Sequence, residues 1–347
     1  MKEVKKRILW VDIAKALTIL SVPISHTLPL DLTIRSMIFS FHMPLFFILS
    51  GFTTKLATDW KTLFKRLKKN FLYLIVPTLL VITIFALSDT LSKTNIFGFF
   101  PKFAYWMREF FIDRYPEGFY TASAVWFLVA LFWAKLFMDF INVVFKTEKN
   151  GILFFLLGAF GMSMGVFEFR PPFFLDLGLV AMLFMEIGIL WRRYEERINK
   201  YSTLITIVAA IYWFSRTMRG DYIEMWTRFY AGFEVCILVA VAGTWLVAEF
   251  SKMIEESTKK IKKGFAKKVL DSFITLGKNT MILYLVHCLE YVFFGYMWDF
   301  RDGSDATLWL SIAIRFALNL AGYVIVKNTI CLVKNIRGSK AYALLKK

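Results

Sequence analysis

The sequence of 347 residues is poor in cysteine and contains no long polar segment. Its three cysteines cannot form a complete set of disulfide pairs, which excludes a disulfide-stapled fold, and they lie in apolar stretches or at their ends. We therefore expect three buried thiols and no metal site built from them. No linker or composition shift separates two folding units, so we expect residues 1–347 to form a single domain with no separate soluble domain. The cysteines are Cys236, Cys288 and Cys331.

Acidic residues are also scarce, at 26 against 43 basic residues, which gives a net charge of +17. In a soluble protein this excess would suggest a nucleic-acid partner. A hydrophobic content of 58% and a mean hydropathy of +0.55 exclude an ordinary soluble protein. Lipid admits only helices or closed barrels, and the alternation of barrel strands is absent. We predict an all-α, polytopic integral membrane helix bundle whose partner is the lipid bilayer, with no nucleic acid.

Apolar runs long enough to cross a bilayer recur along the whole chain. Basic residues fall mostly on alternate connections between these runs. This distribution predicts an even number of spans, with both termini in the cytoplasm. We therefore expect a multi-pass protein of the plasma membrane. Asp12 and Lys15 interrupt the first run, so we expect it to be retained as a span and not cleaved as a signal peptide. The ten predicted spans cover residues 8–29, 33–54, 71–88, 123–145, 151–168, 176–192, 201–216, 228–250, 271–291 and 307–330.

Three outer connections combine aromatic and charged residues. The run FGFFPKFAYWMREFF (97–111) suits a helix lying in the membrane interface. The runs FEFRPPFF (167–174) and SRTMRGDYIEMW (215–226) are rich in arginine and aromatic rings. They fit an aromatic belt with anchoring charges, and they also fit a sugar-binding surface, since rings stack on sugar faces.

Ionisable residues inside the spans are the strongest functional signal, because such groups usually mark a site or face a wet cavity. All three histidines of the chain, His26, His42 and His287, lie in predicted spans. Lys15 precedes His26 by eleven residues, about three helical turns, so the two project from nearly the same face. Asp12 lies three residues before Lys15 and is its expected ion-pair partner.

A neutral imidazole in this setting suits a general base, since its ordinary pKa lies near neutrality. A structural role for each histidine and a metal site are the alternatives, although no HxxxH spacing supports a metal. The run FSFHMPLFFILSGF (39–52) adds Pro44, which frees the carbonyl of Ser40 and should turn His42 inward. Gly51 in the same run should let two backbones approach closely.

The runs WVDIAKALTILSVPISH (10–26) and FSFHMPLFFILSGF together resemble the opening of the membrane-bound acyltransferase 3 family, in particular its fucose 4-O-acetylase-like branch. That family has a basic residue, ten intervening residues and a histidine in its first span, which are Lys15 and His26 here. FKRLKKNFLYLIVP (64–77) resembles its basic stretch before the third span, and AVWFLVALF (124–132) resembles its WFL element. ITLGKNTMILYLVH (274–287) resembles its G-x-N-S-x-x-x-Y-x-x-H pattern, with Thr280 in place of serine.

The resemblance implies an O-acyltransferase that moves an acyl group, most often acetyl, from cytoplasmic acetyl-CoA to a hydroxyl of a cell-envelope polysaccharide or lipid-linked glycan. Acyl-CoA is then a substrate, with no bound cofactor and no metal. The chain completes the transfer itself or passes its product to a separate periplasmic or extracellular partner. The implied catalytic residues are His26, as base or acyl carrier, and His42. The implied donor- or substrate-binding residues are Lys15, Asp12, Arg66, Lys69, Trp126, Asn279, Tyr284 and His287.

Two other classes of function fit the same spans. A transporter or flippase for a lipid-linked sugar would also place ionisable groups in the membrane, although the chain shows no internal repeat of the kind that marks many transporters. A membrane scaffold would need all three histidines to be structural. The basic cluster of Lys65, Arg66, Lys68 and Lys69 can attract the phosphates of CoA, and ordinary positive-inside topology explains it equally well.

Overall fold

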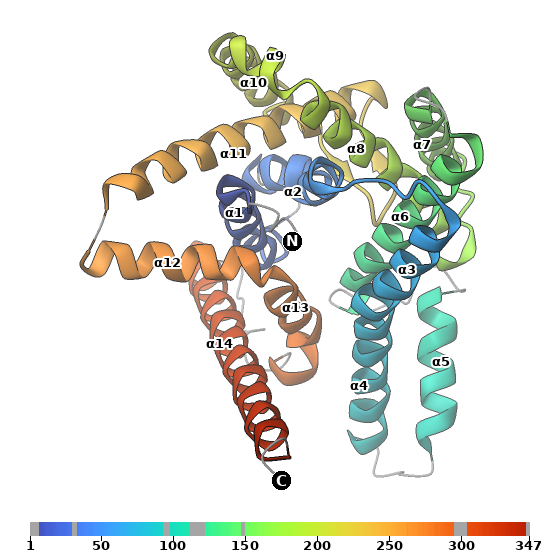
Figure 1. The fold of residues 1–347 in the computed structure, drawn as a ribbon, viewed down its shortest axis with the longest axis vertical. Helices are drawn as coiled ribbons and strands as arrows, with labels where there is room; N and C mark the ends of the chain where they lie inside the picture. The colour runs from blue at the N-terminus through green and yellow to red at the C-terminus, as the bar shows by residue number, and fades with distance from the viewer. Residues whose placement is uncertain are drawn as a thin grey trace.

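The computed structural model describes residues 7–29, 33–92, 98–111, 122–146, 150–261, 263–294 and 304–344 (Figure 1). Helices make up most of these ranges, with one two-stranded antiparallel hairpin in which Ile223 pairs with Tyr230. The elements are α1 Leu9–Ser25, α2 Thr33–Thr53, α3 Trp60–Asn70, the π-helix η1 Phe71–Ile75, α4 Val76–Ser92, α5 Phe99–Phe111, η3 Ala122–Val125, α6 Trp126–Phe145, α7 Asn150–Val166, η4 Pro172–Phe174, α8 Leu175–Arg193, α9 Glu195–Lys200, α10 Ser202–Thr217, β1 Ile223–Glu224, β2 Phe229–Tyr230, α11 Glu234–Lys260, α12 Phe265–Lys278, α13 Thr280–Phe294 and α14 Asp305–Leu344.

The prediction of a helical membrane bundle is confirmed. Every predicted span overlaps a helix or a helix pair, although the span over 228–250 begins just before β2 and its helix, α11, starts only at Glu234. Within the described ranges, six helices are long and apolar enough to cross a membrane, and a bent pair adds a seventh. The count of ten spans stays a prediction, because several of the remaining helices, such as α7, are shorter. The six are residues Thr33–Thr53, Trp60–Leu91, Trp126–Phe145, Pro172–Arg193, Glu234–Lys260 and Ala306–Val333.

The predicted span over 271–291 is a bent pair of helices, because the chain turns by 75° between α12 and α13. The break falls at Asn279, whose backbone leaves the helical region (φ −124°, ψ 30°). Just before it, Gly277 packs on the backbone of α1, where an added Cβ would lie 1.8 Å from the carbonyl oxygen of Asp12. The bend therefore lets α12 pack on α1 while α13 packs on α4 and α14.

The third predicted span begins earlier than expected. Its helix starts at Trp60, where the side chain of Asp59 accepts a hydrogen bond of 2.8 Å from the amide of Thr62 as an N-cap. The helix then widens into η1 just before Pro77, which has no N–H to donate to Tyr73. The segment predicted to lie in the membrane interface forms a helix, α5, which runs alongside α4 in Figure 1 and is joined to it by an ion pair of 3.0 Å between Lys102 and Asp89; its place in the interface stays a prediction.

The centre of the bundle is a close contact between α2 and α8. A Cβ added to Gly51 of α2 would lie 1.9 Å from the carbonyl oxygen of Met185, and one added to Gly188 of α8 would lie 1.9 Å from that of Ile48. The two helices therefore touch through their backbones, which only glycine permits. The prediction that Gly51 allows a close backbone approach is confirmed.

Aromatic rings and the ammonium of Lys252 gather where α1 begins and where α2 and α8 end, beside α11. We call this end of the bundle the basic end. Trp10 contacts Phe52 and Trp191 with ring centroids 5.1 and 5.7 Å apart. The ammonium of Lys252 lies 5.4 Å from the ring of Trp245 and 5.5 Å from that of Trp10. This cation–π cluster holds the four helices together at one end.

Two of the three cysteine predictions hold. Cys236 and Cys288 are buried free thiols, whereas Cys331 is exposed on α14. The prediction of a buried thiol at Cys331 is wrong because no described helix packs on that part of α14, where the side chains of residues 328–333 are all exposed.

Candidate active site

The structure brings the three histidines together at the end of the bundle opposite to the basic end, which we call the histidine end. His26 is the C-cap of α1, His42 lies in α2 and His287 lies in α13. The ring of His26 stacks on that of His287 with centroids 5.4 Å apart, and its centroid lies 6.4 Å from that of His42. Three imidazoles from three helices therefore form one cluster.

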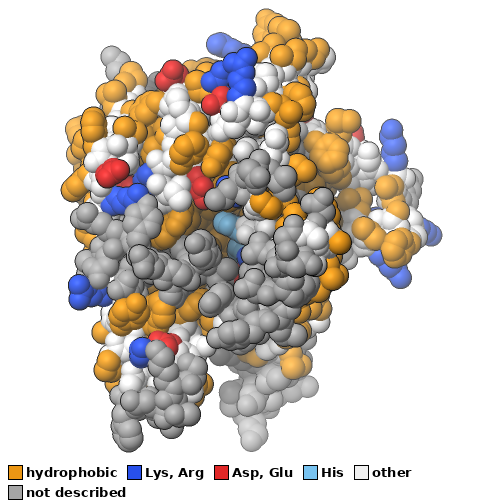
Figure 2. Space-filling model, turned by 180° about the vertical axis from the view of Figure 1, so that it is seen from behind, with side chains coloured by type: hydrophobic (Ala, Val, Ile, Leu, Met, Phe, Trp, Pro, Cys, Tyr) orange, Lys and Arg blue, Asp and Glu red, His pale blue; other side chains and the backbone are white. Residues whose placement is uncertain are grey.

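The members of the cluster differ in accessibility and in their hydrogen bonds. His26 is exposed, whereas the residues His42 and His287 are only 3% and 2% exposed. Figure 2 shows an imidazole at the bottom of a hollow, bordered by acidic and basic side chains. Nδ1 of His42 lies 3.1 Å from the carbonyl oxygen of Ile38. Since a carbonyl only accepts, Nδ1 carries the proton of this bond, and Nε2 of a neutral His42 keeps its lone pair.

A buried polar network supports the cluster from α13 and α14. Oε2 of Glu290 lies 3.2 Å from Nδ1 of His287 and accepts a 2.6 Å hydrogen bond from Asn319. The other oxygen of Glu290 pairs with Arg315, which also donates a 2.8 Å hydrogen bond to the hydroxyl of Thr27. Thr27 directly follows His26, so this network ties the end of α1 to His287.

A second charged pair lies on the other side of the cluster. Cζ of Arg35 in α2 lies 4.1 Å above the ring of Phe39, and this ring contacts both His26 and His42 at 5.4 and 4.8 Å. Arg35 faces Glu224 of β1, with Nη2 and Oε1 3.5 Å apart. Burial raises the pKa of Glu224 above its ordinary value, and the charge of Arg35 partly opposes this shift.

A cavity of about 280 Å³ lies between α1, α2, α6 and α13, the first two and the last of which also carry the histidines, although no histidine lines it. Lys15 and Lys135 both line it, and in the described part of the chain neither ammonium has a carboxylate within 4.0 Å. Three other lining residues stand close to the histidines in sequence: Val22 precedes His26 by four residues, Met43 follows His42, and Tyr284 precedes His287 by three. The full lining is Lys15, Ile19, Val22, Met43, Phe46, Ser50, Thr53, Phe127, Leu128, Leu131, Lys135, Thr280, Met281 and Tyr284.

Four helices therefore position one site. A residue three or four positions away on a helix is displaced by about 4.5–6 Å along the axis, so Val22 and Tyr284 lie roughly one turn from His26 and His287. The hydroxyl of Tyr284 donates to the carbonyl oxygen of Ala124, which fixes the ring at the cavity wall. Of the residues implied by the family resemblance, Lys15, Tyr284 and the three histidines are brought together here.

The predicted ion pair between Asp12 and Lys15 is wrong. Asp12 instead receives both arms of Arg7, at 2.5 Å from Nε and 3.0 Å from Nη2. The planar guanidinium matches the two carboxylate oxygens, which a lysine ammonium cannot do. Lys15 is thereby left to face the cavity.

Four further predicted residues lie away from the cavity lining. Arg66 donates to Asp139 and to the carbonyl oxygen of Lys55, both at 2.6 Å, and so fastens α3 to α6. Lys69 is exposed, with its ammonium 5.9 Å from the centroid of the Tyr73 ring. Trp126 is a buried core residue at the start of α6. Asn279 lies at the bend between α12 and α13.

Sequence reasoning missed three charged residues of the site: Lys135, Glu290 and Arg315. All three lie inside predicted spans, so the rule that ionisable groups in spans mark function would have found them. No group of three or more His, Cys, Asp or Glu side chains that could hold a metal ion occurs in the residues the structure describes.

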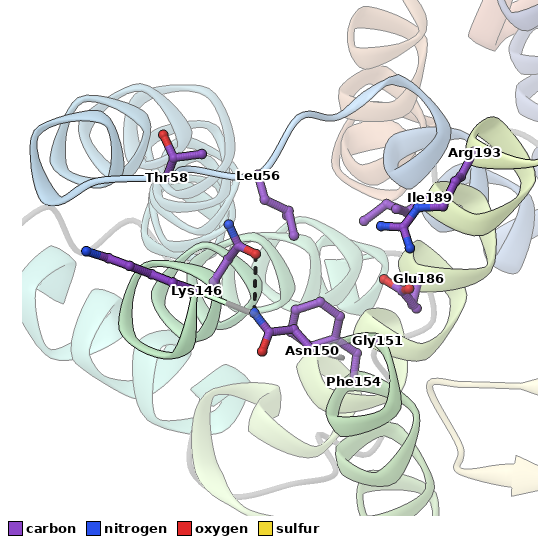
Figure 3. Close-up of a pocket in the computed structure, with 10 residues that line it drawn as sticks. Leu56, Thr58, Lys146, Asn150, Gly151, Phe154, Glu186, Ile189 and Arg193 are labelled. Carbon is purple, nitrogen blue, oxygen red and sulfur yellow. Dashed lines mark hydrogen bonds between the residues drawn. The ribbon is translucent and has the colours of Figure 1, made fainter. Parts of the chain in front are cut away.

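A second cavity, of about 400 Å³, lies near the end of α6, the start of α7 and the end of α8 (Figure 3). It is lined by Glu186 and Arg193 of α8, and by Asn142 and Asn150, whose side chains are joined by a 3.3 Å hydrogen bond. None of the histidines or of the predicted site residues lines it. Of these two cavities, the smaller one is lined by predicted site residues, Lys15 and Tyr284, and the histidines line neither.

The helices and the intramembrane histidines define a multi-pass membrane protein with an internal polar site. The family model described as acyltransferase domain matches residues 8–327, nearly the whole chain. The protein belongs to this family, acyltransferase 3, and it is a membrane acyltransferase with an acyl donor and an acyl acceptor. No curated protein and no solved structure matches the chain.

Proposed function

We propose that this enzyme is an O-acyltransferase that takes an acyl group, most simply acetyl, from cytoplasmic acyl-CoA and places it on a hydroxyl of a cell-envelope glycan. The cavity between the two lysines and the histidine cluster is the observation that carries the proposal. Two ammonium groups that have no carboxylate partner among the described residues, and that line one cavity, suit a polyanionic donor such as CoA. The far end of the same cavity lies about one helical turn from the imidazoles that the chemistry needs.

The reaction needs one base at the acceptor hydroxyl. His26, the accessible member of the cluster, takes the hydroxyl proton as the oxygen attacks the thioester carbonyl carbon. The new C–O bond forms, the C–S bond breaks, and the imidazolium returns the proton to the CoA sulfur. In the alternative route, the acyl group first moves from sulfur to His26 and then to the acceptor oxygen.

The surrounding residues take supporting roles in this proposal. His42, with its tautomer set by the bond to Ile38, and His287, held beside Glu290, orient His26 and the acceptor. Lys15 and Lys135 neutralise donor charge within the cavity. The basic end then faces the cytoplasm and the histidine end faces outward, as the distribution of basic residues predicts for a plasma-membrane protein.

The acceptor class rests on the resemblance to the fucose 4-O-acetylase-like branch, which points to polysaccharide or a lipid-linked glycan. The glycans of cells with and without this gene, compared by mass, test this class directly. We expect an acetyl-sized increment that depends on the gene. A larger increment would identify a longer acyl group, and the absence of any increment would contradict a glycan acceptor.

The catalytic assignment is tested with membranes that contain the full-length protein, labelled acetyl-CoA and glycan extract. His26→Ala should abolish transfer, with protein level and elution in size-exclusion chromatography unchanged, because His26 is exposed and fills no core position. Cys331→Ala, on the exposed face of α14, is the matched control. Retained transfer by His26→Ala would remove His26 from the mechanism.

The same membranes separate the two routes. Labelled acetyl-CoA is added without acceptor, and the protein is analysed for covalent label. Label on the wild type that disappears in His26→Ala indicates an acyl carrier, and unlabelled wild type that is active with acceptor indicates a general base.

A further inference from the structure

A charged side chain of the histidine end has no role in the mechanism above. Arg35 lies in α2, seven residues and so about two helical turns before His42. Its side chain is only 8% exposed. Its guanidinium lies over the ring of Phe39, which itself touches His26 and His42. One aromatic ring therefore separates this cation from the two proposed catalytic histidines.

The guanidinium of Arg35 is incompletely paired. Nη1 is buried and has no hydrogen-bond partner in the described part of the chain. Nη2 lies 3.5 Å from Oε1 of Glu224, longer than the about 2.7–2.9 Å of a charge-assisted hydrogen bond. Leaving donors of a buried cation unsatisfied is costly, and such a group calls for an anion.

Other buried guanidinium groups near the histidine end are already committed to the protein. Arg228 donates to both oxygens of Asp176 at 2.8 and 3.1 Å and to the carbonyl oxygen of Trp226 at 2.7 Å. Arg315 donates to Glu290 and Thr27. These pairs hold elements together, whereas Nη1 of Arg35 has no hydrogen-bond partner among the residues that the structure describes.

We propose that Arg35 is the anion-binding residue of the acceptor site, so that the acceptor carries a carboxylate or phosphate group close to the hydroxyl that is acylated. The planar fork of a guanidinium suits both groups, since each presents two oxygens. Without an acceptor, the carboxylate of Glu224 lies beside the guanidinium of Arg35. It therefore competes with the acceptor anion for Arg35. The inference rests on the proposed function, whose acceptor class it narrows to acidic glycans.

The test uses full-length protein in proteoliposomes and three acceptors of the same sugar sequence. One contains a hexuronic acid, one a phosphate group, and one the corresponding neutral hexose. We expect the wild type to prefer one or both anionic acceptors, and the two anionic arms identify which group is recognised. Arg35→Gln should lower the ratio of kcat/KM for the anionic over the neutral acceptor by about 10- to 100-fold, as expected for the loss of one or two charge-assisted hydrogen bonds.

Two further variants keep the test decisive. Arg35→Lys should recover part of the preference, because it keeps the charge and loses the fork. Glu224→Gln should strengthen the preference, because it removes the competing carboxylate, and it carries the test if Arg35→Gln does not fold. Wild type that does not discriminate between the acceptors, or variants that leave the ratio unchanged, would overturn the inference. Failure of the wild type to consume acyl-CoA with any acceptor would instead refute the proposed function.

Discussion

The backbone contact between α2 and α8 makes Gly51→Ala a sharp test of the fold and of the site together. The new Cβ would lie 1.9 Å from the carbonyl oxygen of Met185 and 2.7 Å from its carbonyl carbon, whereas real Cβ contacts essentially never fall below 3.0 Å. The obstructing atoms belong to the backbone of a helix and cannot rotate away. The whole of α2 must therefore shift from α8.

Overpacking of this kind typically costs about 1–3 kcal/mol, and a backbone obstruction should place Gly51→Ala near the upper figure. For a chain of this size, that corresponds to a fall of roughly 5 °C in apparent Tm. His42 lies on the same helix, so its position relative to His26 also changes. Since a misplacement of about 1 Å can cost roughly 100-fold in rate, we expect transferase activity to fall further than stability.

The measurement is the apparent Tm of detergent-purified protein, read from the monodisperse fraction that survives heating, together with acetyl transfer in membranes. Gly151→Ala is the matched control. Its Cβ meets only the side chain of Glu186, with Oε1 at 2.5 Å and Cδ at 3.2 Å, and that side-chain end can turn away. If Gly51→Ala is as stable and as active as Gly151→Ala, the packing of α2 on α8 described above is incorrect.

Two further predictions concern charged residues. Asp176→Asn removes the carboxylate from a pair with Arg228 in which the side chains are 0% and 4% exposed, so it should destabilise the protein by about 3–5 kcal/mol in a Tm assay. Asp139→Asn, whose arginine partner is 26% exposed, should cost less, and an equal loss would contradict the argument from burial. Lys135→Met should raise the KM for acyl-CoA in initial-rate assays with little change in Tm, because it removes a cavity charge. Lys146→Met, which alters the other cavity, is its control, and equal KM values would remove Lys135 from the donor site.

Much of the helical framework follows from the sequence because apolar runs of bilayer length leave the backbone only one way to satisfy its hydrogen bonds. The same reasoning predicts that the histidines cluster. An imidazole in a span is costly unless it faces other polar groups, and the three histidines lie together. The close backbone contact at Gly51 was also predictable, since a small residue in a span marks a close helix contact.

What the sequence could not supply is the identity of partners that are distant along the chain. Asp12 has Lys15 one helical turn away, yet it pairs with Arg7, whose fork binds both carboxylate oxygens. The bend at Asn279 depends on Gly277 meeting the backbone of Asp12, a contact between two ends of the chain. Lys135 carries no motif, and only the packing of α1 and α6 around one cavity sets it opposite Lys15.

The position of the cavity also bears on how an acyl group would cross the bilayer in the proposed reaction. A donor held at Lys15 and Lys135 would have its charged portion at the basic end, where a polyanion can stay hydrated. From there the acyl group would only need to cross the part of the cavity lined by Val22, Met43 and Tyr284. Since these residues lie about one helical turn or less from the histidines, only the thioester needs to reach the cluster and CoA itself need not cross. An acceptor that approaches from the histidine end would meet the acyl group at His26, which is the accessible imidazole of the three. The proposed mechanism would therefore require no large movement of helices, and its specificity would depend on the residues that border the hollow around His26.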